Sequence, residues 1–179
     1  MIQTDSEAVI ARTRQWITDV VVKCNFCPFA AREIKRNSIH YEVLFAATLT
    51  NVLPAVIKSF QQLDDDPAIE TSFLVLPDRF SSFYAYLEML DLCEQLNKKE
   101  NYEGIYQITS FHPAYLFAGS NENDPGNYTN RSPYPMLHFL REASVSKAVD
   151  DYPEIDQVTK RNIAFTREKG LAYMKQLFT

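Results

Sequence analysis

Side chains that could act as acids, bases and hydrogen-bonding groups gather in one stretch of the chain, from Ser110 to His138. His112 and His138 lie near its two ends, and histidine suits proton transfer because its ordinary pKa lies near physiological pH. Cys27 is a third candidate, because the dipole of a helix beginning beside it would favour the thiolate. The predicted catalytic residues are therefore His112, His138 and Cys27.

Arginine, tyrosine and amide side chains in the same stretch indicate an anionic ligand. Arg131 offers a planar fork that stays charged and matches a carboxylate or a phosphate, and Asn130 and Tyr134 add neutral hydrogen-bonding groups. The prolines on both sides of Tyr134 have no N–H to donate, so side chains must supply most of the contacts. The predicted substrate-binding residues are Asn127, Asn130, Arg131, Tyr134, Arg79 and Arg141.

Thiol and metal chemistry are two further alternatives. Cys24 and Cys27 form a C-x-x-C pair, which would fit a redox dithiol, although packing of a small apolar cysteine is the commoner case. Cys27, His112, His138 and Asp124 are of types that bind metals. Their spacing matches no known metal motif, so we predict no metal site from it.

The same residues also have structural interpretations. An ordered loop rich in Asn, Arg and Tyr could simply satisfy its own buried backbone. His138 could pair with Glu142 at the edge of the core, and His112 could cap a strand. Cys27, His112 and Asn130 would suit acyl transfer only if the fold brought them together.

Helical and strand patterns alternate along the chain and indicate how these residues are positioned. Strands separated by helices imply parallel β-α-β crossovers. We expect an α/β fold, a layered β-α-β-α-β core with parallel strands, preceded by an N-terminal helix and followed by a long ordered loop and two C-terminal helices. The expected helices are at 5–22, 28–35, 50–63, 82–98, 135–149 and 154–169, the strands at 39–46, 71–76 and 105–111, and the loop at 114–135.

This arrangement places several candidate residues near one another. In open α/β sheets ligands bind beyond the carboxyl ends of the strands. Arg79 follows the second expected strand and His112 the third, so both should open toward the same side. In the helix expected at 135–149, His138 and Arg141 are three residues apart and share one face.

Length and composition exclude several classes of protein. A chain of 179 residues fits a single domain, residues 1–179. A net charge of -5 argues against a nucleic-acid partner, because such a protein must neutralise phosphates. The 4 glycines all lie at or beyond Gly104, which excludes a glycine-rich phosphate loop in the first half. Without a nucleotide-cofactor motif, hydrolysis or group transfer is favoured over oxidoreduction, and the cofactor stays unknown.

The predicted cellular compartment depends mainly on features that the sequence lacks. The N-terminus carries no basic region followed by an apolar core, and no apolar run reaches the length of a membrane span. An odd number of cysteines, 3, suits a reducing compartment. We therefore predict a cytoplasmic protein with no membrane partner, of unknown oligomeric state.

Three motifs together resemble one family of uncharacterised, mainly bacterial proteins about as long as this chain. They are CPFA at 27–30, SFHP at 110–113 and NYTNRSPYPMLH at 127–138. The resemblance implies a single-domain protein whose family motif includes Cys27 but no cysteine at the position of Cys24. That departure weakens a dithiol mechanism, and the resemblance brings no known activity.

These observations lead to one preferred function and several alternatives. We predict a hydrolase or group transferase acting on a small anionic metabolite, with the anion held by Arg131. His112 would be the general acid/base, near Cys27 or His138. The alternative is a non-catalytic small-ligand-binding or regulatory domain that uses the same pocket. Metal-binding and thiol-redox proteins are further alternatives.

Overall fold

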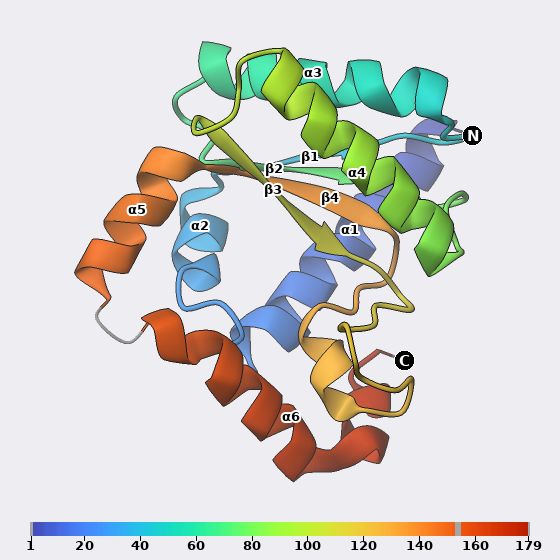
Figure 1. Ribbon diagram of the computed structural model, residues 1–179, viewed down its shortest axis with the longest axis vertical. Coiled ribbons are helices and arrows are strands. Elements are labelled where there is room, and N and C mark those ends of the chain that lie inside the picture. Colours follow the sequence, from blue (N-terminus) through green and yellow to red (C-terminus); the bar gives the residue numbers. More distant parts are fainter. Residues whose placement is uncertain (1, 153–154, 179) are drawn as a thin grey trace.

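A computed structural model describes residues 2–152 and 155–178 of the chain (Figure 1). Residue 154, the predicted start of the last helix, lies outside the described residues. The elements are, in order, α1 (Ile2–Trp16), the π-helical η1 (Ile17–Val22), α2 (Ala30–Arg36), β1 (Ile39–Val43), α3 (Leu49–Asp65), β2 (Thr71–Val75), α4 (Phe83–Lys99), β3 (Tyr106–Phe111), the 3₁₀ helix η2 (Pro125–Thr129), β4 (Met136–Arg141), α5 (Glu142–Asp151) and α6 (Ile155–Gln176).

The strands form one mixed sheet in the order β1-β2-β4-β3. β1 and β2 are parallel, whereas β4 is antiparallel to both β2 and β3. β1, β2 and β3 therefore run in one direction, with β4 running the opposite way between β2 and β3. The predicted α/β class is confirmed, but the predicted core of parallel strands is not, because β4 is antiparallel to both of its neighbours. The reason is that the chain returns through the loop after β3 and enters the sheet without a helical crossover.

The segment Met136–Arg141 is strand β4, where the sequence predicted a helix at 135–149. Its side chains alternate between two apolar clusters, with Leu137 and Phe139 in one and Met136 in the other. This period of two, together with paired strands on both sides, is what a central strand requires. A helix follows only after the strand, as α5.

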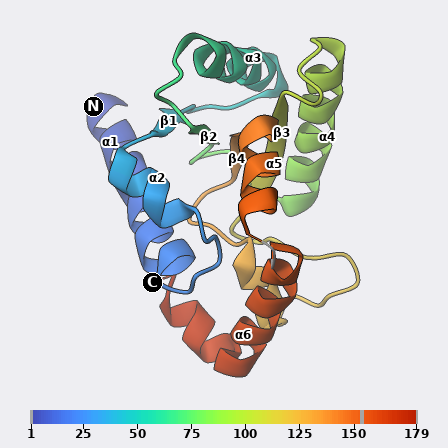
Figure 2. The same cartoon turned by 90° about the vertical axis from the view of Figure 1, so that its left-hand side faces the viewer.

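Helices cover the two faces of the sheet, and each face has its own apolar cluster (Figure 2). α3 and α4 pack on the side chains of Leu74, Leu137 and Phe139, which define the α3/α4 face. α1 and η1 pack on Phe73 and Val75, which define the α1 face. Each fully buried side chain of this size contributes roughly 2 kcal/mol, so the two clusters hold the register of the strands.

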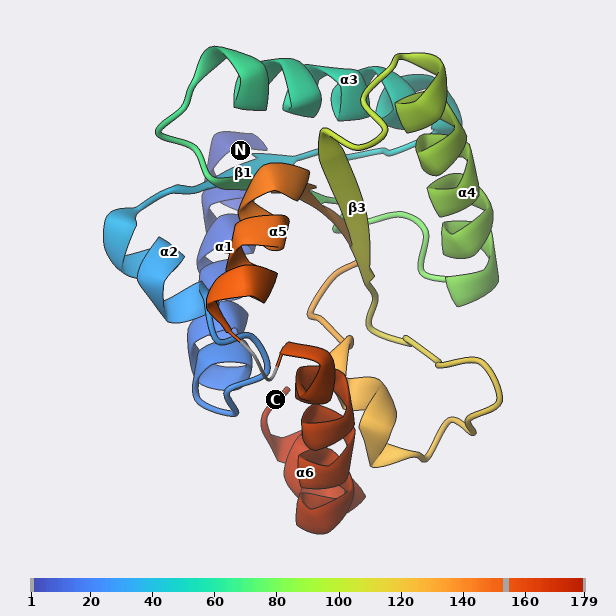
Figure 3. The same ribbon diagram turned by 60° about the vertical axis from the view of Figure 1, so that its left-hand side comes forward.

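The loop between β3 and β4 is held in place by the last helix. Its short helix η2 packs against α6 (Figures 1 and 3). Gly126 allows this approach, because a Cβ at that position would lie 3.1 Å from Asp124 Oδ1 and 3.3 Å from Ile163 Cγ2. Arg167 of α6 forms an ion pair with Asp124, with 2.7 Å between nitrogen and oxygen.

Caps and one bend determine the course of the helices. Thr48 caps α3 through reciprocal hydrogen bonds with Asn51, and Ser82 caps α4. α6 bends at Gly170, whose φ of 82° a glycine adopts without strain. No helix in the described part of the chain combines the length and the apolar character needed to cross a membrane.

Candidate functional site

His138 lies in the middle of β4, with its ring on the α1 face of the sheet. The ring stacks on Phe73 of β2, with 4.0 Å between the centroids and 2° between the planes. The register places His138 directly between Phe73 and Thr109 of β3. The predicted common face of His138 and Arg141 is therefore wrong, because residues three apart in a strand point to opposite faces.

Two threonine hydroxyls contact the two nitrogens of the His138 ring. Nε2 lies 2.5 Å from Thr71 Oγ1, and Nδ1 lies 3.3 Å from Thr109 Oγ1. The Thr71 hydroxyl donates its one hydrogen to the carbonyl of Phe139 at 2.7 Å, so its oxygen accepts from Nε2–H. Nδ1 is therefore unprotonated, and its lone pair faces the Thr109 hydroxyl, whose other acceptor is the carbonyl of His138 at 3.4 Å. We call Thr71, His138 and Thr109 the His138 cluster.

Burial keeps the His138 ring neutral. Desolvation lowers its pKa from the ordinary value of 6.5 to about 3, because the aromatic side chains around it cannot solvate an imidazolium. Thr71 is buried, whereas His138, Thr109 and Phe111 are partly exposed. The cluster thus runs from the interior toward the surface, and its unprotonated nitrogen is the one beside the more exposed hydroxyl.

Cys27 lies just before α2, on the same side of the sheet as His138. Its neighbours Cys24 and Ala30 pack against the apolar cluster that contains Phe73. Burial raises the pKa of the Cys27 thiol, and the backbone N–H groups at the start of α2 offset that rise only in part. The thiol is therefore protonated at neutral pH, which is the opposite of the activated thiolate that the sequence predicted.

His112 is fully buried between the loops that follow β2 and β3. Its Nε2 donates to the carbonyl of Phe80 at 2.8 Å, and its Nδ1 accepts from the N–H of Ala114 at 2.9 Å. The ring contacts Phe83 and Tyr86 of α4, with centroids 5.2 and 5.0 Å away. Burial lowers the pKa of His112, and backbone groups occupy both of its nitrogens.

The sheet separates the two histidines that the sequence placed in one pocket. The loops after β2 and β3 do meet, as expected for strands that run in one direction, and the His112–Phe80 hydrogen bond joins them. However, His112 packs on α4 at the α3/α4 face, whereas His138 stacks on Phe73 at the α1 face. The composite site of His112 and His138 is therefore not formed.

Arg131 binds the backbone of its own loop. Its Nη2 donates to the carbonyl of Glu122 at 3.0 Å, and its Nε donates to the carbonyl of Tyr115 at 3.4 Å. The guanidinium also lies above the ring of Tyr128, 4.4 Å from the centroid. These contacts match the structural interpretation of Arg131, and its role in holding an anion stays a prediction.

The other predicted loop residues are also engaged within the loop. Asn130 accepts from the hydroxyl of Thr129 at 3.0 Å, and Tyr134 packs against the apolar cluster on the α1 face. Asn127 is fully buried, and its side chain makes three hydrogen bonds. Its partners are the N–H of Phe117, the hydroxyl of Ser120 and the carbonyl of Asn121.

The last two predicted binding residues, Arg79 and Arg141, lie at opposite ends of the sheet, because Arg79 follows the end of β2 and Arg141 lies beside its start. Arg79 is exposed in the loop after β2. Arg141 ends β4 and donates to two carbonyls at the end of α3, which stabilises the negative end of the helix dipole, and to a third in the loop before β2. The acceptors are the carbonyls of Leu63, Asp66 and Ile69.

Comparison with known proteins assigns this chain to a family. A family model described as "Protein of unknown function (DUF1415)" matches residues 8–176, which is nearly the whole chain. The chain belongs to the DUF1415 family. Comparisons with curated proteins and with solved structures gave no match.

In this DUF1415 chain, the residues whose types could bind a metal do not gather. Within residues 2–152 and 155–178, no group of three or more His, Cys, Asp and Glu side chains is arranged to hold a metal ion. Asp124, one of the candidates, pairs instead with Arg167.

Thr71 and Thr109 are the residues of the His138 cluster that the sequence interpretation missed. Both stand in strands that the sequence predicted, at positions whose side chains point to the α1 face. The alternation of side chains along a strand could have identified them, because a strand at 136–141 places His138 on the same face as both threonines. The helical interpretation of that segment removed the signal.

Proposed function

We propose that the chain is an enzyme, a hydrolase or group transferase that acts on a small anionic metabolite at the His138 cluster. The single observation that carries the proposal is the order of hydrogen bonds: the Thr71 oxygen accepts from Nε2–H, and Nδ1 faces the Thr109 hydroxyl. An orienting acceptor, an imidazole and a hydroxyl in this order form the arrangement that activates a hydroxyl nucleophile. His138 takes the role that the sequence gave to His112.

The proposed chemistry uses only groups of the cluster. Thr109 Oγ1 attacks an acyl carbon or a phosphorus atom, and its proton passes to His138 Nδ1. The bond to the leaving group breaks, and the leaving group takes that proton. Water or a second substrate then attacks the Thr109 ester in the same way, giving its proton to Nδ1, and the Thr109 oxygen recovers one. The 3.3 Å between Nδ1 and Thr109 is long for proton transfer, and such contacts tighten when substrate binds.

The low pKa of His138 supports an anionic substrate. An imidazole whose pKa is about 3 is a weak base at neutral pH. A negative charge about 4 Å from the ring stabilises the imidazolium by roughly 4 kcal/mol at an effective dielectric constant of about 20, which raises the pKa by about 3. The substrate itself would thus make His138 a competent base. Arg131 has no part in this proposal, because its guanidinium already donates to two loop carbonyls.

The test compares turnover of 4-nitrophenyl phosphate and mono-4-nitrophenyl succinate, which are anionic, with that of neutral 4-nitrophenyl acetate. We expect the anionic esters to be preferred. Replacing a general base or a nucleophile costs roughly 100-fold or more in kcat, so T109V and H138Q should each lose that much. T71V should lose less, because it removes only the group that orients the ring.

Matched controls separate this mechanism from the thiol alternative. C27S should keep the wild-type rate, because the thiol is protonated and has no part in the scheme. A T109V variant that keeps the wild-type rate would exclude the hydroxyl mechanism. A C27S variant that loses activity would assign catalysis to Cys27 instead.

A second function, a non-catalytic small-ligand-binding domain, is favoured by one observation. A buried neutral imidazole whose Nε2–H is already engaged is a fixed acceptor, and fixed polar groups in apolar surroundings are typical of binding sites. This function predicts no turnover of the three esters, but a change in the ring ¹⁵N shifts of His138 on addition of mono-methyl succinate.

A cytoplasmic location is part of the proposal. The described cysteines, Cys24, Cys27 and Cys93, are all free, which is what a reducing compartment favours.

A further inference from the structure

β1 is an edge strand that has backbone groups available for a further strand. Within the described chain it pairs only with β2. The N–H of Leu44 donates to the carbonyl of Val75 at 2.9 Å, and the carbonyl of Ser38 accepts from the N–H of Glu70 at 2.8 Å. Backbone direction alternates along a strand, so even-numbered residues between them face β2. The N–H and C=O groups of Tyr41 and its odd-numbered neighbours therefore point away from the sheet.

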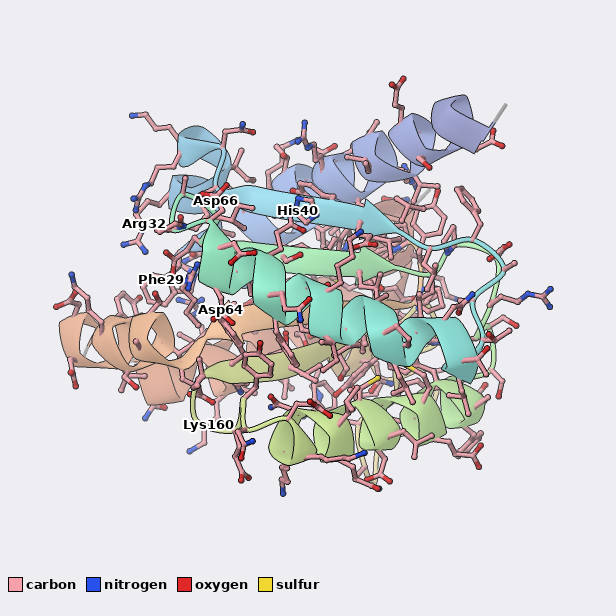
Figure 4. The ribbon with its side chains drawn as sticks, turned by 90° about the horizontal axis from the view of Figure 1, so that it is seen from above. Phe29, Arg32, His40, Asp64, Asp66 and Lys160 are labelled. Atoms are coloured by element: carbon pink, nitrogen blue, oxygen red, sulfur yellow. The ribbon has the colours of Figure 1, made fainter. Side chains whose placement is uncertain are left out.

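A groove of about 580 Å³ runs along this free edge. α1 forms one wall, which includes Ile10, and α3 forms the other; the Arg14 guanidinium of α1 lies over the ring of Tyr41, 5.0 Å from its centroid. Figure 4 shows β1 along the outer side of the sheet, with His40 on the strand and Asp66 near its beginning. An edge strand at the bottom of a groove is the geometry in which an extended peptide adds to a sheet.

The two walls differ in chemistry. Ile10 and Tyr41 give the α1 side apolar surface, beside the Arg14 guanidinium, whereas Asp65 and Asp66 at the end of α3 make the other wall acidic. The cations on that wall do not balance them. Lys58 is already paired with Glu42, with 2.8 Å between nitrogen and oxygen, and desolvation lowers the pKa of His40. The residues that line the groove therefore carry a net negative charge, and the Arg141 guanidinium, which binds the carbonyl of Asp66, is not among them.

We propose that this groove binds an extended segment of a partner protein in which apolar and basic side chains alternate. The segment adds as a fifth strand along β1. Side chains of a strand point alternately to the two faces, so its apolar residues meet Ile10 and Tyr41 and its Lys or Arg residues meet Asp65 and Asp66. A basic partner fits better than a second copy of this chain, because each copy has a net charge of -5.

Fluorescence polarisation with labelled six-residue peptides tests this proposal on the full chain. We expect Ac-VKVKVK-amide to bind at least 10-fold more tightly than Ac-VEVEVE-amide. Two N-methylated forms of the basic peptide test the strand geometry, each blocking alternate amides. Only one of the two sets faces β1, so one form should lose binding and the other should keep it.

Charge-reversal variants locate the site. The double variant D65K/D66K should weaken binding of the basic peptide about 10-fold, since it replaces two negative charges at the rim of the groove with two positive ones. E88K/D91K is the matched control, because it makes the same change in charge at exposed positions of α4. The control should bind as the wild type does.

Three results would overturn the proposal. One is equal binding of the basic and acidic peptides, and another is equal loss from the two N-methylated forms. The third is a dimer in sedimentation velocity that D65K/D66K dissociates, which would make a second copy the occupant of the groove.

Discussion

The buried neutral ring of His138 makes a quantitative prediction about stability in acid. The pKa of His138 is about 3 in the folded protein and takes its ordinary value of 6.5 when the chain unfolds. The unfolded chain therefore binds a proton first as the pH falls. The contribution of this residue is fully present above pH 6.5 and is lost between about pH 6.5 and pH 3.

The size of the loss follows from the difference between the two pKa values. Below pH 6.5 the free energy of unfolding falls by about 1.4 kcal/mol for each pH unit through this one group. Between pH 7.5 and pH 5.0 the loss is roughly 2 kcal/mol, a large part of the stability of an ordinary domain. Carboxylates with lowered pKa values, such as Glu33, lose their contributions only at lower pH.

Urea unfolding at pH 7.5, 6.0 and 5.0 measures this loss, with H138Q as the comparison. Glutamine cannot be charged and can still bond to Thr71 and Thr109. The free energy of unfolding of the variant should keep any pH dependence due to His112 and His40, whose pKa values are also lowered. It should lack the pH dependence due to His138. Parallel curves for the wild type and H138Q would refute the buried neutral ring.

Two further predictions concern parts of the fold that position the cluster. R141M removes the donor to the carbonyls of Leu63, Asp66 and Ile69, of which the Asp66 carbonyl still accepts from the N–H of Ile69, so it should lower the free energy of unfolding by roughly 2 kcal/mol, measured in urea. A loss below about 0.5 kcal/mol would show that water replaces the guanidinium. G126A should cost about 1 kcal/mol, because its Cβ meets Asp124 and Ile163 at 3.1 and 3.3 Å. A variant as stable as the wild type would mean that η2 and α6 move apart freely.

Much of the fold could be predicted from local patterns. β1, β2 and β3 lie where alternation and β-branched residues placed strands, and α3 and α4 lie where apolar side chains recur at helical spacing. β4 could not be predicted, because Met-Leu-His-Phe-Leu-Arg is apolar on both faces, as a central strand requires, and a helix starting at Pro135 accounts for it equally well. Only its pairing with β2 and β3, which are distant in sequence, decides between the two.

Only part of the candidate site could be predicted, because the rest also depends on pairing between strands that are distant in sequence. His138 was identified from its residue type, but its partners Thr71 and Thr109 depend on the strand register. Arg131 and Asn127 have the same side chains whether they bind a ligand or their own loop. Here the backbone of a long loop, which has few secondary-structure partners, takes up their hydrogen bonds. Composition does not distinguish the two cases.

Covalent trapping of the Thr109 hydroxyl tests the central claim most directly. Mono-4-nitrophenyl succinate carries the negative charge that the mechanism needs; attack by the Thr109 oxygen leaves a succinyl ester on it, and 4-nitrophenol departs with the proton. Peptide mapping by mass spectrometry after an acid quench should find one succinyl group, on Thr109, and H138Q should be labelled roughly 100-fold more slowly. Labelling of another residue, or an unchanged rate in H138Q, would contradict the proposed role of the His138 cluster.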